Sequence, residues 1–346
     1  MSKTLQDYAT LINDTIQSNE INHYITTDNM CQNLGGIDTF KNINIPQGKV
    51  RSFQKDDVLL SNIRLYFRKV YRAKQKGGCS SDVLVFRAKH IDSATLFAIL
   101  SSQIFTDYAC SGSQGSKMPR DNKTHMMDFK IPTINFTIAK VFNSIQNKIE
   151  NNHKINELLH TLAYKIYEYY FKYKPKNAKL EQIIIENPKS NIMVKNAQKT
   201  QDKYPFFTSG DNILSYPKAI IDGRNCFLNT GGNAGIKFYV GKASYSTDTW
   251  CICANEFSDY LYLLLSSIKN HINQSFFQGT SLKHLQKNLL KKYPIYMPSA
   301  HEIKKFNQII IPLLTLISIN TRTSKKLEQI RDFLLPLLLK QQVKPK

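Results

Sequence analysis

The sequence predicts an α+β protein made of two similar mixed α/β globules and two long helices that pair as an antiparallel coiled coil. One observation is an apolar 4-3 alternation, held over about five heptads, that occurs over residues 135–173 and returns near the C-terminus. A second observation is that the segments before the two helices follow one plan at an offset of about 165 to 168 residues. The chain is therefore expected to be an internal duplication with a pseudo-twofold relation.

The expected order is globule, helix, globule, helix. A chain of 346 residues is long enough for two domains that each bury their own core. The predicted boundaries are residues 1–133 for the first globule, 134–174 for the first helix, 175–299 for the second globule and 300–346 for the second helix.

The heptad positions of the two helices carry the pairing prediction. The predicted apolar seam residues are Phe142, Ile145, Ile149, Leu159, Ile166, Ile310, Leu313, Ile317, Leu327 and Leu334. Both copies turn polar at the same place, with Asn152 and Asn156 in one and Asn320 and Ser324 in the other. Polar groups in a seam weaken packing but fix register, so a shared polar layer favours helices that pair with each other. Two unrelated amphipathic helices would not explain the shared layer.

The charge points to a polyanionic partner. The chain has 47 Lys plus Arg against 26 Asp plus Glu, a net charge of +21. Such a charge favours nucleic acid or an anionic membrane surface. The N-terminal residues lack a signal-peptide core, and the longest apolar runs, residues 260–268 and 309–319, are too short to span a bilayer. Nucleic acid is therefore the favoured partner, and no membrane association is expected.

Cysteine usage predicts a reducing compartment. The six cysteines show no C-x-x-C pairing and are expected to be small buried hydrophobic residues of a cytoplasmic protein. Cys251 and Cys253 share one face of a predicted strand, but no His–Cys set follows at zinc spacing, so no metal site is expected.

Short β-prone segments recur in both halves. Residues 57–62, 69–72 and 82–86 are predicted strands, with Gly77–Gly78 as a turn between the last two. In the second half, residues 204–209, 227–230 and 247–248 correspond to residues 24–27, 59–62 and 81–82.

These segments resemble a known family. They are DDVLLSNIRLYFRKVYRAKQKGGCSSDVLVFRA in the first half, YPFFTSG and CFLNTGGNAGIKFYVGKASYSTDTWCI in the second, SLKHLQKNLLKKYPIYMPS, and the ending LEQIRDFLLPLLL. The chain resembles the DNA-specificity subunit of a type I restriction–modification system over essentially its whole length. In that family each globule is a target-recognition domain, and the two helices separate the globules.

The resemblance implies partners as well as a fold. It implies a bipartite, interrupted double-stranded DNA site with one half read by each globule. It also implies methyltransferase (M) subunits, two of them, that carry S-adenosylmethionine, and restriction (R) subunits attached through the methyltransferase. The chain itself is expected to hold no cofactor. One departure is that SNIRLYFRK stands in the first half where NTGGNAGIKF stands in the second, so the halves should read different sequences.

Catalytic motifs are absent from the sequence. There is no G-x-G-x-x-G behind a strand, no Walker loop, no H-E-x-x-H and no N-P-P-[YF] of amino-methyltransferases. Residues 229–235 are glycine-rich, but a strand follows them rather than a helix, so a β-turn is favoured over a phosphate cradle. We therefore expect a non-catalytic subunit.

Candidate DNA contacts lie between and beside the predicted strands. Lys and Arg supply phosphate contacts, while Arg, Asn and Gln discriminate base edges. The candidates in the first half are Thr26, Asn62, Arg64, Arg68, Lys69, Arg72, Lys74, Lys76, Gln114, Lys117 and Arg120. Those in the second half are Ser209, Asn229, Thr230, Asn233, Lys237, Tyr239, Lys242, Gln278 and Lys283. Asn62, Arg64, Asn229, Thr230 and Asn233 are predicted to read bases. For any single residue, a solvated surface role remains an alternative.

Two other functions stay open at this stage. One is the specificity subunit of a related fused or type IIB-like system. The other is a non-enzymatic scaffold whose basic surface binds a different polyanion such as RNA. Two globules held by a rigid helical spacer suit a split double-stranded site better than RNA, which is mostly read in single-stranded loops.

Overall fold

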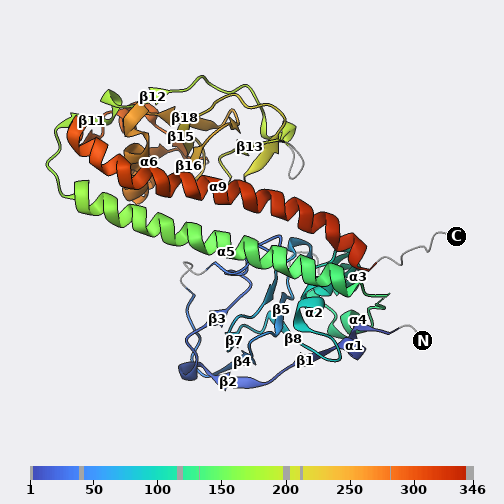
Figure 1. The fold of residues 1–346 in the computed structure, drawn as a ribbon. Coiled ribbons are helices and arrows are strands. Elements are labelled where there is room, and N and C mark those ends of the chain that lie inside the picture. The colour runs from blue at the N-terminus through green and yellow to red at the C-terminus, as the bar shows by residue number, and fades with distance from the viewer. Residues whose placement is uncertain are drawn as a thin grey trace. The chain divides into compact units, whose positions relative to one another are not determined.

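The computed structural model describes residues 3–38, 43–114, 120–131, 133–197, 203–210, 213–280 and 282–339. The chain forms two compact units, here called unit 1 (residues 1–151 with 326–346) and unit 2 (residues 152–325). Helices α5 (Phe136–Tyr167) and α9 (Ala300–Leu338) each contribute one part to each unit (Figure 1). The long helices and the mixed α+β composition predicted from the sequence are confirmed.

Unit 1 combines two sheets with a set of helices. Its strands form one sheet in the order β1-β8-β5-β6 and another in the order β2-β4-β7-β3. Besides parts of α5 and α9, its elements are α1 (Leu5–Tyr8), β1 (Ala9–Ile12), β2 (Thr15–Gln17), η1 (Ser18–Glu20), β3 (Tyr24–Ile25), β4 (Lys49–Phe53), β5 (Val58–Ser61), η2 (Leu65–Phe67), β6 (Val70–Arg72), β7 (Gly77–Cys79), β8 (Val83–Ala88), α2 (Ser93–Leu100), α3 (Gln103–Ser111), β9 (Ser113–Gln114), β10 (Arg120–Asp121) and α4 (Lys123–Met127).

Unit 2 repeats the order of the first sheet and the parallel strand pair of the second sheet. Its sheets run in the orders β12-β18-β15-β16 and β14-β13-β17. Besides parts of α5 and α9, its elements are η3 (Glu168–Lys172), β11 (Ala178–Lys179), η4 (Leu180–Gln182), β12 (Ile185–Glu186), η5 (Val194–Asn196), β13 (Tyr204–Phe207), β14 (Leu214–Tyr216), β15 (Arg224–Asn229), β16 (Ile236–Val240), β17 (Ser244–Tyr245), β18 (Thr249–Cys253), η6 (Asn255–Phe257), α6 (Ser258–Ser267), α7 (Lys269–Ser275), β19 (Phe277–Gln278), β20 (His284–Leu285), α8 (Lys287–Lys291) and β21 (Pro294–Ile295).

The central strands are apolar without alternation because both faces of their sheet are buried. Val58 and Leu60 pack with the helices of unit 1, while Leu59 between them packs with the second sheet. In unit 2, Leu228 faces the helices and Phe227 faces the second sheet. A strand covered on both sides reads as a continuous apolar run, which is why residues 57–62 and 82–86 were predictable as buried strands.

The two units share a hydrogen-bond plan that confirms the internal duplication. Strand β5 pairs with β8 as β15 pairs with β18, and β3 runs parallel to β7 as β13 does to β17. Beyond the end of β5, Asn62 N donates to Asp82 O over 2.8 Å. Beyond β15, Thr230 N donates to Asp248 O over 3.2 Å. The two halves therefore correspond down to single backbone contacts.

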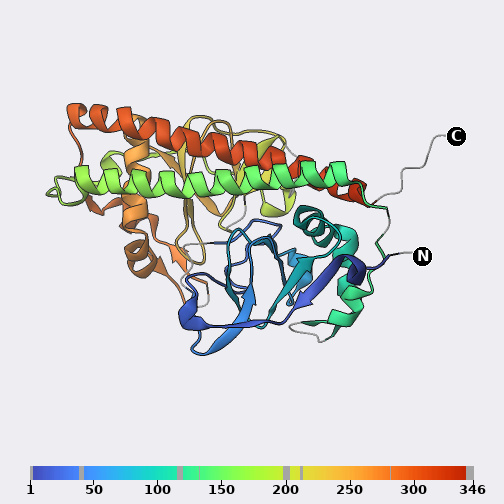
Figure 2. The same ribbon diagram turned by 60° about the horizontal axis from the view of Figure 1, so that its bottom comes forward.

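Helices α5 and α9 pair antiparallel, and their polar layers meet as predicted. Asn152 Nδ2 donates to Ser324 Oγ over 3.1 Å, and Asn320 Nδ2 donates to Asn156 Oδ1 over 3.0 Å. The two helices lie side by side in both ribbon views (Figures 1 and 2). The predicted seam residues are buried at Phe142, Ile149, Asn152, Ile310 and Ile317 and half-buried at Ile145, Leu159, Ile166, Leu313, Asn320, Leu327 and Leu334.

A second polar layer lies in unit 1. Arg331 is almost fully buried and donates from Nη1 to Gln146 Oε1 over 3.0 Å. Gln146 in turn donates to the carbonyl of Leu34 over 2.7 Å, which joins the helix pair to the globular part of unit 1.

Both long helices begin at side-chain caps. Asn135 Oδ1 accepts from Ile138 N over 3.1 Å at the start of α5. Before α9, Ser299 and Glu302 form a reciprocal capping box, in which Ser299 N donates to Glu302 Oε2 over 2.9 Å. These hydrogen bonds from Ser299, with one from the Tyr296 hydroxyl, lower the pKa of Glu302 to about 2.

The prediction of a turn at Gly77–Gly78 is wrong. These glycines form strand β7, which pairs with β4 on one side and β3 on the other. A Cβ on Gly77 would lie 2.5 Å from the carbonyl oxygen of His23, so the neighbouring backbone approaches too closely for a side chain. Glycines in a strand mark such a close approach as well as turns.

Cys79, Cys226 and Cys251 are buried as expected of small apolar residues, whereas Cys31, Cys110 and Cys253 are only half-buried. Burial raises the pKa of Cys79 to about 12 and that of Cys226 well above its usual value. Among the described residues, no helix has the length and apolarity needed to cross a membrane.

Candidate nucleic-acid interface

In unit 2 four segments meet at the end of strand β15. Thr230 Oγ1 donates to Asp248 O over 2.7 Å, and Thr230 N donates to Ser209 Oγ over 3.3 Å. The hydroxyl of Ser209 also donates to Asp248 O. Gly232 N donates to the carbonyl of Lys283 over 2.9 Å. We call this meeting point of residues 208–210, 229–235, 246–248 and 282–285 the unit 2 corner.

Lys237 holds two of these segments together. Its ammonium donates to Thr208 O and Gly210 O, each over 2.7 Å, and reaches Asn229 Oδ1 at 3.4 Å. Asn229 is itself buried, and its Nδ2 donates to the carbonyl of Asn233 over 3.1 Å. The side-chain amide of Asn229, a predicted base-reading residue, is therefore hydrogen-bonded within its own loop. Asn233, by contrast, is exposed at the surface of the corner.

Unit 1 has a matching corner at the end of β5, formed by residues 26–29, 61–69 and 80–82. Asn62 is buried there, and its Oδ1 accepts no hydrogen bond from the described residues. Lys69 Nζ donates to the carbonyl of Thr27 over 2.5 Å. Thr26, beside it, donates from its backbone N to Asn29 Oδ1 over 2.8 Å.

The loops that cross the two corners differ in length and conformation. Ser61 N donates to Lys69 O, and Asn229 N donates to Gly235 O, so these pairs close equivalent loops. The unit 1 loop spans residues 62–68 and contains η2, whose flanking residues Arg64 and Arg68 both have positive φ. Tyr66 in this loop is 55% exposed. The unit 2 loop spans the shorter stretch 230–234 and carries no helix. The surface that each corner presents is therefore different.

Several predicted phosphate contacts in unit 1 instead have partners within the protein. Arg68 donates from Nη2 to Ser101 O over 3.0 Å and lies 3.9 Å from the Asp332 carboxylate of α9. Burial lowers its pKa, which the charge of Asp332 opposes.

Arg72 and Lys74 are also engaged. Arg72 lies 3.7 Å from the carboxylate of Asp56. Lys74 donates to Asn147 Oδ1 over 2.7 Å and forms an ion pair with Glu150 at 3.2 Å. Lys74 therefore links the residues after β6 to α5, a role that the basic cluster in the sequence did not indicate. Lys76, by contrast, is exposed.

The remaining candidates of unit 2 divide by exposure. Tyr239 is buried against Phe207, with the ring centroids 5.6 Å apart, and burial raises its pKa. This placement does not favour a direct contact from that ring to DNA. Lys242, Gln278 and Lys283 are exposed. Sequence reasoning missed Gly210 and His284, which lie at the corner but have no charge or motif to mark them.

Two candidates are described only in part, and a third is not described. The backbones of Gln114 and Arg120 pair in the β9–β10 hairpin, and β19–β20 is its counterpart in unit 2. Their side chains, and Lys117 as a whole, lie outside the described residues.

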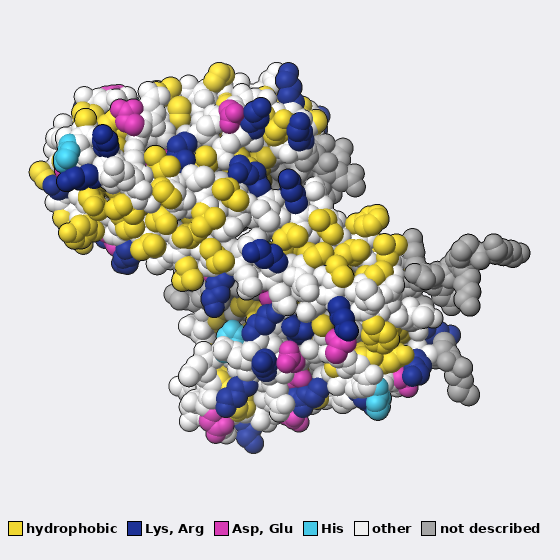
Figure 3. All heavy atoms as spheres, in the orientation of Figure 1, with side chains coloured by type: hydrophobic (Ala, Val, Ile, Leu, Met, Phe, Trp, Pro, Cys, Tyr) yellow, Lys and Arg dark blue, Asp and Glu magenta, His cyan; other side chains and the backbone are white. Residues whose placement is uncertain are grey.

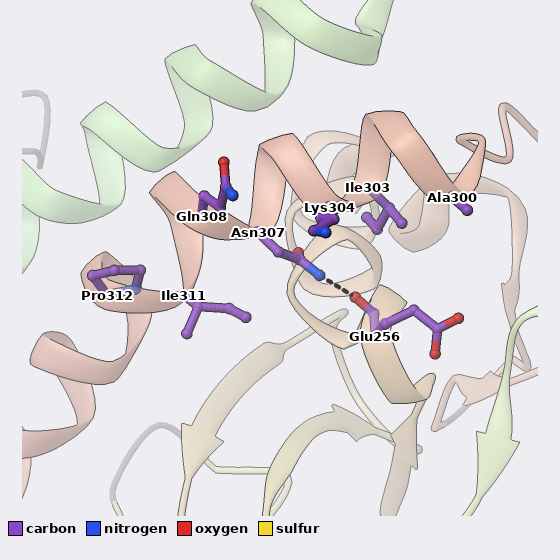
Figure 4. Close-up of a pocket in the computed structure, with 8 residues that line it drawn as sticks. All are labelled: Glu256, Ala300, Ile303, Lys304, Asn307, Gln308, Ile311 and Pro312. Carbon is purple, nitrogen blue, oxygen red and sulfur yellow. Dashed lines mark hydrogen bonds between the residues drawn. The ribbon is translucent and has the colours of Figure 1, made fainter.

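Within the described ranges, no group of His, Cys, Asp or Glu side chains is arranged to hold a metal ion. A shallow pocket of about 540 Å³ lies elsewhere in unit 2, between α9 and η6 (Figure 4). There Asn307 Nδ2 donates to the carbonyl of Glu256 over 2.8 Å, with Ile311 and Pro312 beside it.

The helices of unit 2 expose an apolar face. Yellow side chains gather over α5 and α9 in Figure 3. The exposed apolar residues of this part of the two helices and of the residues just after α5 are Ile155, Leu158, Leu162, Tyr169, Tyr173, Ile309, Ile311, Leu316 and Ile319. The spacing of Ile155, Leu158 and Leu162 puts them on one side of α5. Exposed apolar side chains that gather in this way are typical of an interaction site.

The fold and the two corners together define a class of protein. Its members are internally duplicated chains that have a corner at the end of a central strand in each half and an antiparallel pair of long helices. Residues 176–329 match the family model described as "Type I restriction modification DNA specificity domain". This match confirms the resemblance to type I specificity subunits that the sequence motifs indicated.

One solved structure supports the fold over nearly the whole chain. The S subunit of the type I restriction–modification system from M. genitalium matches with a TM-score of 0.64 at 14% identity, covering 99% of this chain and 96% of that one. The HsdS subunit from Thermoanaerobacter tengcongensis matches with a TM-score of 0.37 at 13% identity, covering 98% and 96%. The fold assignment rests on the first of these. A search of curated proteins finds no match.

Proposed function

We propose that this chain is the DNA sequence-specificity subunit of a type I restriction–modification complex. The observation that carries the proposal is the pair of equivalent corners with unlike loops. Equivalent hydrogen bonds close both loops, yet residues 62–68 and 230–234 differ in length and side chains. A duplicated scaffold with two different reading surfaces suits a bipartite, interrupted double-stranded site.

The chain supplies recognition in this proposal and no chemistry. Methylation and cleavage belong to partner M and R subunits, with S-adenosylmethionine held by the methyltransferase. Two M subunits in a cytoplasmic complex remain part of the proposal. The exposed apolar face of α5 and α9 in unit 2 supports docking of a protein partner, because aliphatic and aromatic side chains at helical spacing suit a helix of another subunit.

The net charge of +21 supports a nucleic-acid partner. Because Lys69, Arg68, Arg72, Lys74 and Lys237 are engaged within the protein, phosphate contacts are assigned instead to exposed residues. These are Lys76, Lys242 and Lys283. Each neutralised phosphate releases counterion and adds about 0.9 to the steepness of the log–log salt dependence of binding.

The test is expression of the chain with its methyltransferase partner in a host that lacks other DNA methylation. Long-read sequencing should then find one interrupted motif, methylated in both strands. A continuous motif, or no methylation by a complex that assembles, would contradict the proposal. Tight binding of structured RNA with no preference for duplex DNA would instead favour the RNA scaffold.

A further inference from the structure

Both corners contain a lysine whose ammonium group points back into the protein. Lys237 lies on β16, on the face of the sheet that also carries Tyr239 and is turned toward β13. Its Nζ contacts three oxygens, those of Thr208, Gly210 and Asn229. An ammonium group has three donors, so these acceptors account for all of them.

Lys69 makes the corresponding contact in unit 1 from a different backbone position. The bond from Ser61 N to Lys69 O matches the bond from Asn229 N to Gly235 O, so Lys69 is the counterpart of Gly235. Gly235 has no room for a side chain, because a Cβ there would lie 2.3 Å from Asn229 Nδ2. In unit 2 the lysine instead stands two residues further on, on the same face of the strand.

The two lysines bind equivalent loops, one in each unit. Strand β3 ends at Ile25 and Lys69 binds the carbonyl of Thr27. Strand β13 ends at Phe207 and Lys237 binds the carbonyls of Thr208 and Gly210. Two lysines at non-equivalent positions thus fix equivalent loops. This recurrence indicates that a hydrogen bond from a lysine to the backbone of this loop is needed in both units.

In unit 2 the fixed loop leads directly to the corner. The two carbonyls bound by Lys237 flank Ser209, and the Ser209 hydroxyl contacts Thr230 N and Asp248 O. Releasing the loop would therefore loosen the surface formed by Gly210, Asn233 and Asp248.

We infer that Lys69 and Lys237 are positioning residues: each fixes the loop after β3 or β13 and thereby shapes the surface with which its own unit reads one half-site. This inference rests on the proposed function. It assigns to these lysines an indirect part in sequence discrimination and no phosphate contact.

The experiment uses the reconstituted complex with Lys237→Met, Lys69→Met and the exposed-lysine controls Lys242→Met and Lys76→Met. Binding is measured over a salt series on duplexes altered in one half-site at a time. Lys237→Met should weaken discrimination at one half-site by on the order of tenfold, the scale of one misplaced base contact. Lys69→Met should do the same at the other half-site. Neither Lys237→Met nor Lys69→Met should change the slope of log binding constant against log salt concentration. If a control lysine contacts phosphate, its replacement should make that slope less steep by about 0.9.

Hydrogen exchange of residues 203–210 in the DNA-free complex provides a second readout, and Lys237→Met should speed it. A fall of about 0.9 in the salt slope of Lys237→Met with discrimination intact would identify a phosphate contact and overturn the inference. Unchanged exchange and discrimination in both variants would also overturn it. If one variant fails to assemble, the other decides, since the two lysines lie in different units. A wild-type complex that binds no duplex would overturn the proposed function, while the exchange arm still tests whether the lysine fixes the loop.

Discussion

Asn152 and Ser324 form a buried hydrogen bond between α5 and α9, with Nδ2 and Oγ 3.1 Å apart. Their sequence separation is 172 residues, and each belongs to a polar layer that the duplicated heptads share. Buried polar groups in a helix seam cost stability unless they find partners, but they select one register. The bond therefore explains why both copies of the heptad pattern tolerate a polar interruption.

Removing one partner of this bond should be worse than removing both. Asn152→Ala leaves the Ser324 hydroxyl buried and unpaired, which costs about 1–3 kcal/mol of unfolding free energy. The double variant Asn152→Leu/Ser324→Ala should lose less, because no polar group is stranded. Urea denaturation of Asn152→Leu, Ser324→Ala and the double variant gives the coupling energy. Additive losses would show that the two side chains do not interact.

Arg224 is the first residue of β15, and we expect its side chain to contribute strongly to the stability of unit 2. It donates from Nε and Nη2 to the two carboxylate oxygens of Asp259, each over 2.5 Å, and from Nη1 to Thr315 of α9 over 3.0 Å. Asp259 is buried, so Arg224→Met should cost about 3–5 kcal/mol by leaving that carboxylate unpaired.

The matched control is Arg72→Met in unit 1. Its partner Asp56 is half-exposed at a distance of 3.7 Å, so the ion pair should contribute under about 1 kcal/mol. Thermal or urea unfolding measures both variants, and equal losses would contradict the assignment of Arg224–Asp259 as the stronger pair.

The capping box at Glu302 predicts a pH dependence. The pKa of Glu302 is lowered to about 2, chiefly by the backbone N–H of Ser299, from an ordinary value of 4.5. A depressed carboxyl pKa adds stability that is fully present above about pH 4.5 and is lost as pH falls through the folded value. Glu302→Gln should therefore be less stable than wild type at neutral pH, and the difference should shrink between pH 4.5 and pH 2. A difference that stays constant over that window would mean that the charge of Glu302 does not stabilise the start of α9.

The sequence was informative where a pattern repeats and where strands are buried on both faces. The heptads predicted the Asn152–Ser324 layer, and the apolar runs predicted β5 and β8. The echo of Ser81–Asp82 in Thr247–Asp248 predicted equivalent positions, and the carbonyls of Asp82 and Asp248 accept matching backbone hydrogen bonds at the ends of the central strands.

Side-chain partners distant in sequence were not predictable. A run of basic residues shows positive charge but not that Arg68 lies beside Asp332, which is contributed by the other end of the chain. The same limit applies to Lys237, whose carbonyl acceptors come from a loop nearly thirty residues earlier. The sequence predicts a turn at Gly77 and Gly78, because the close approach of the backbone before β3 depends on tertiary packing.

The central claim is that each unit reads its own half of a bipartite site. The most direct measurement replaces residues 175–299 with the second globule of another specificity subunit and maps methylated motifs in cells that carry the chimera and the methyltransferase. One half of the motif should change while the other half and its recognition stay as in the parent. A simultaneous change of both halves, or an unchanged motif in an active complex, would contradict independent reading by the two units.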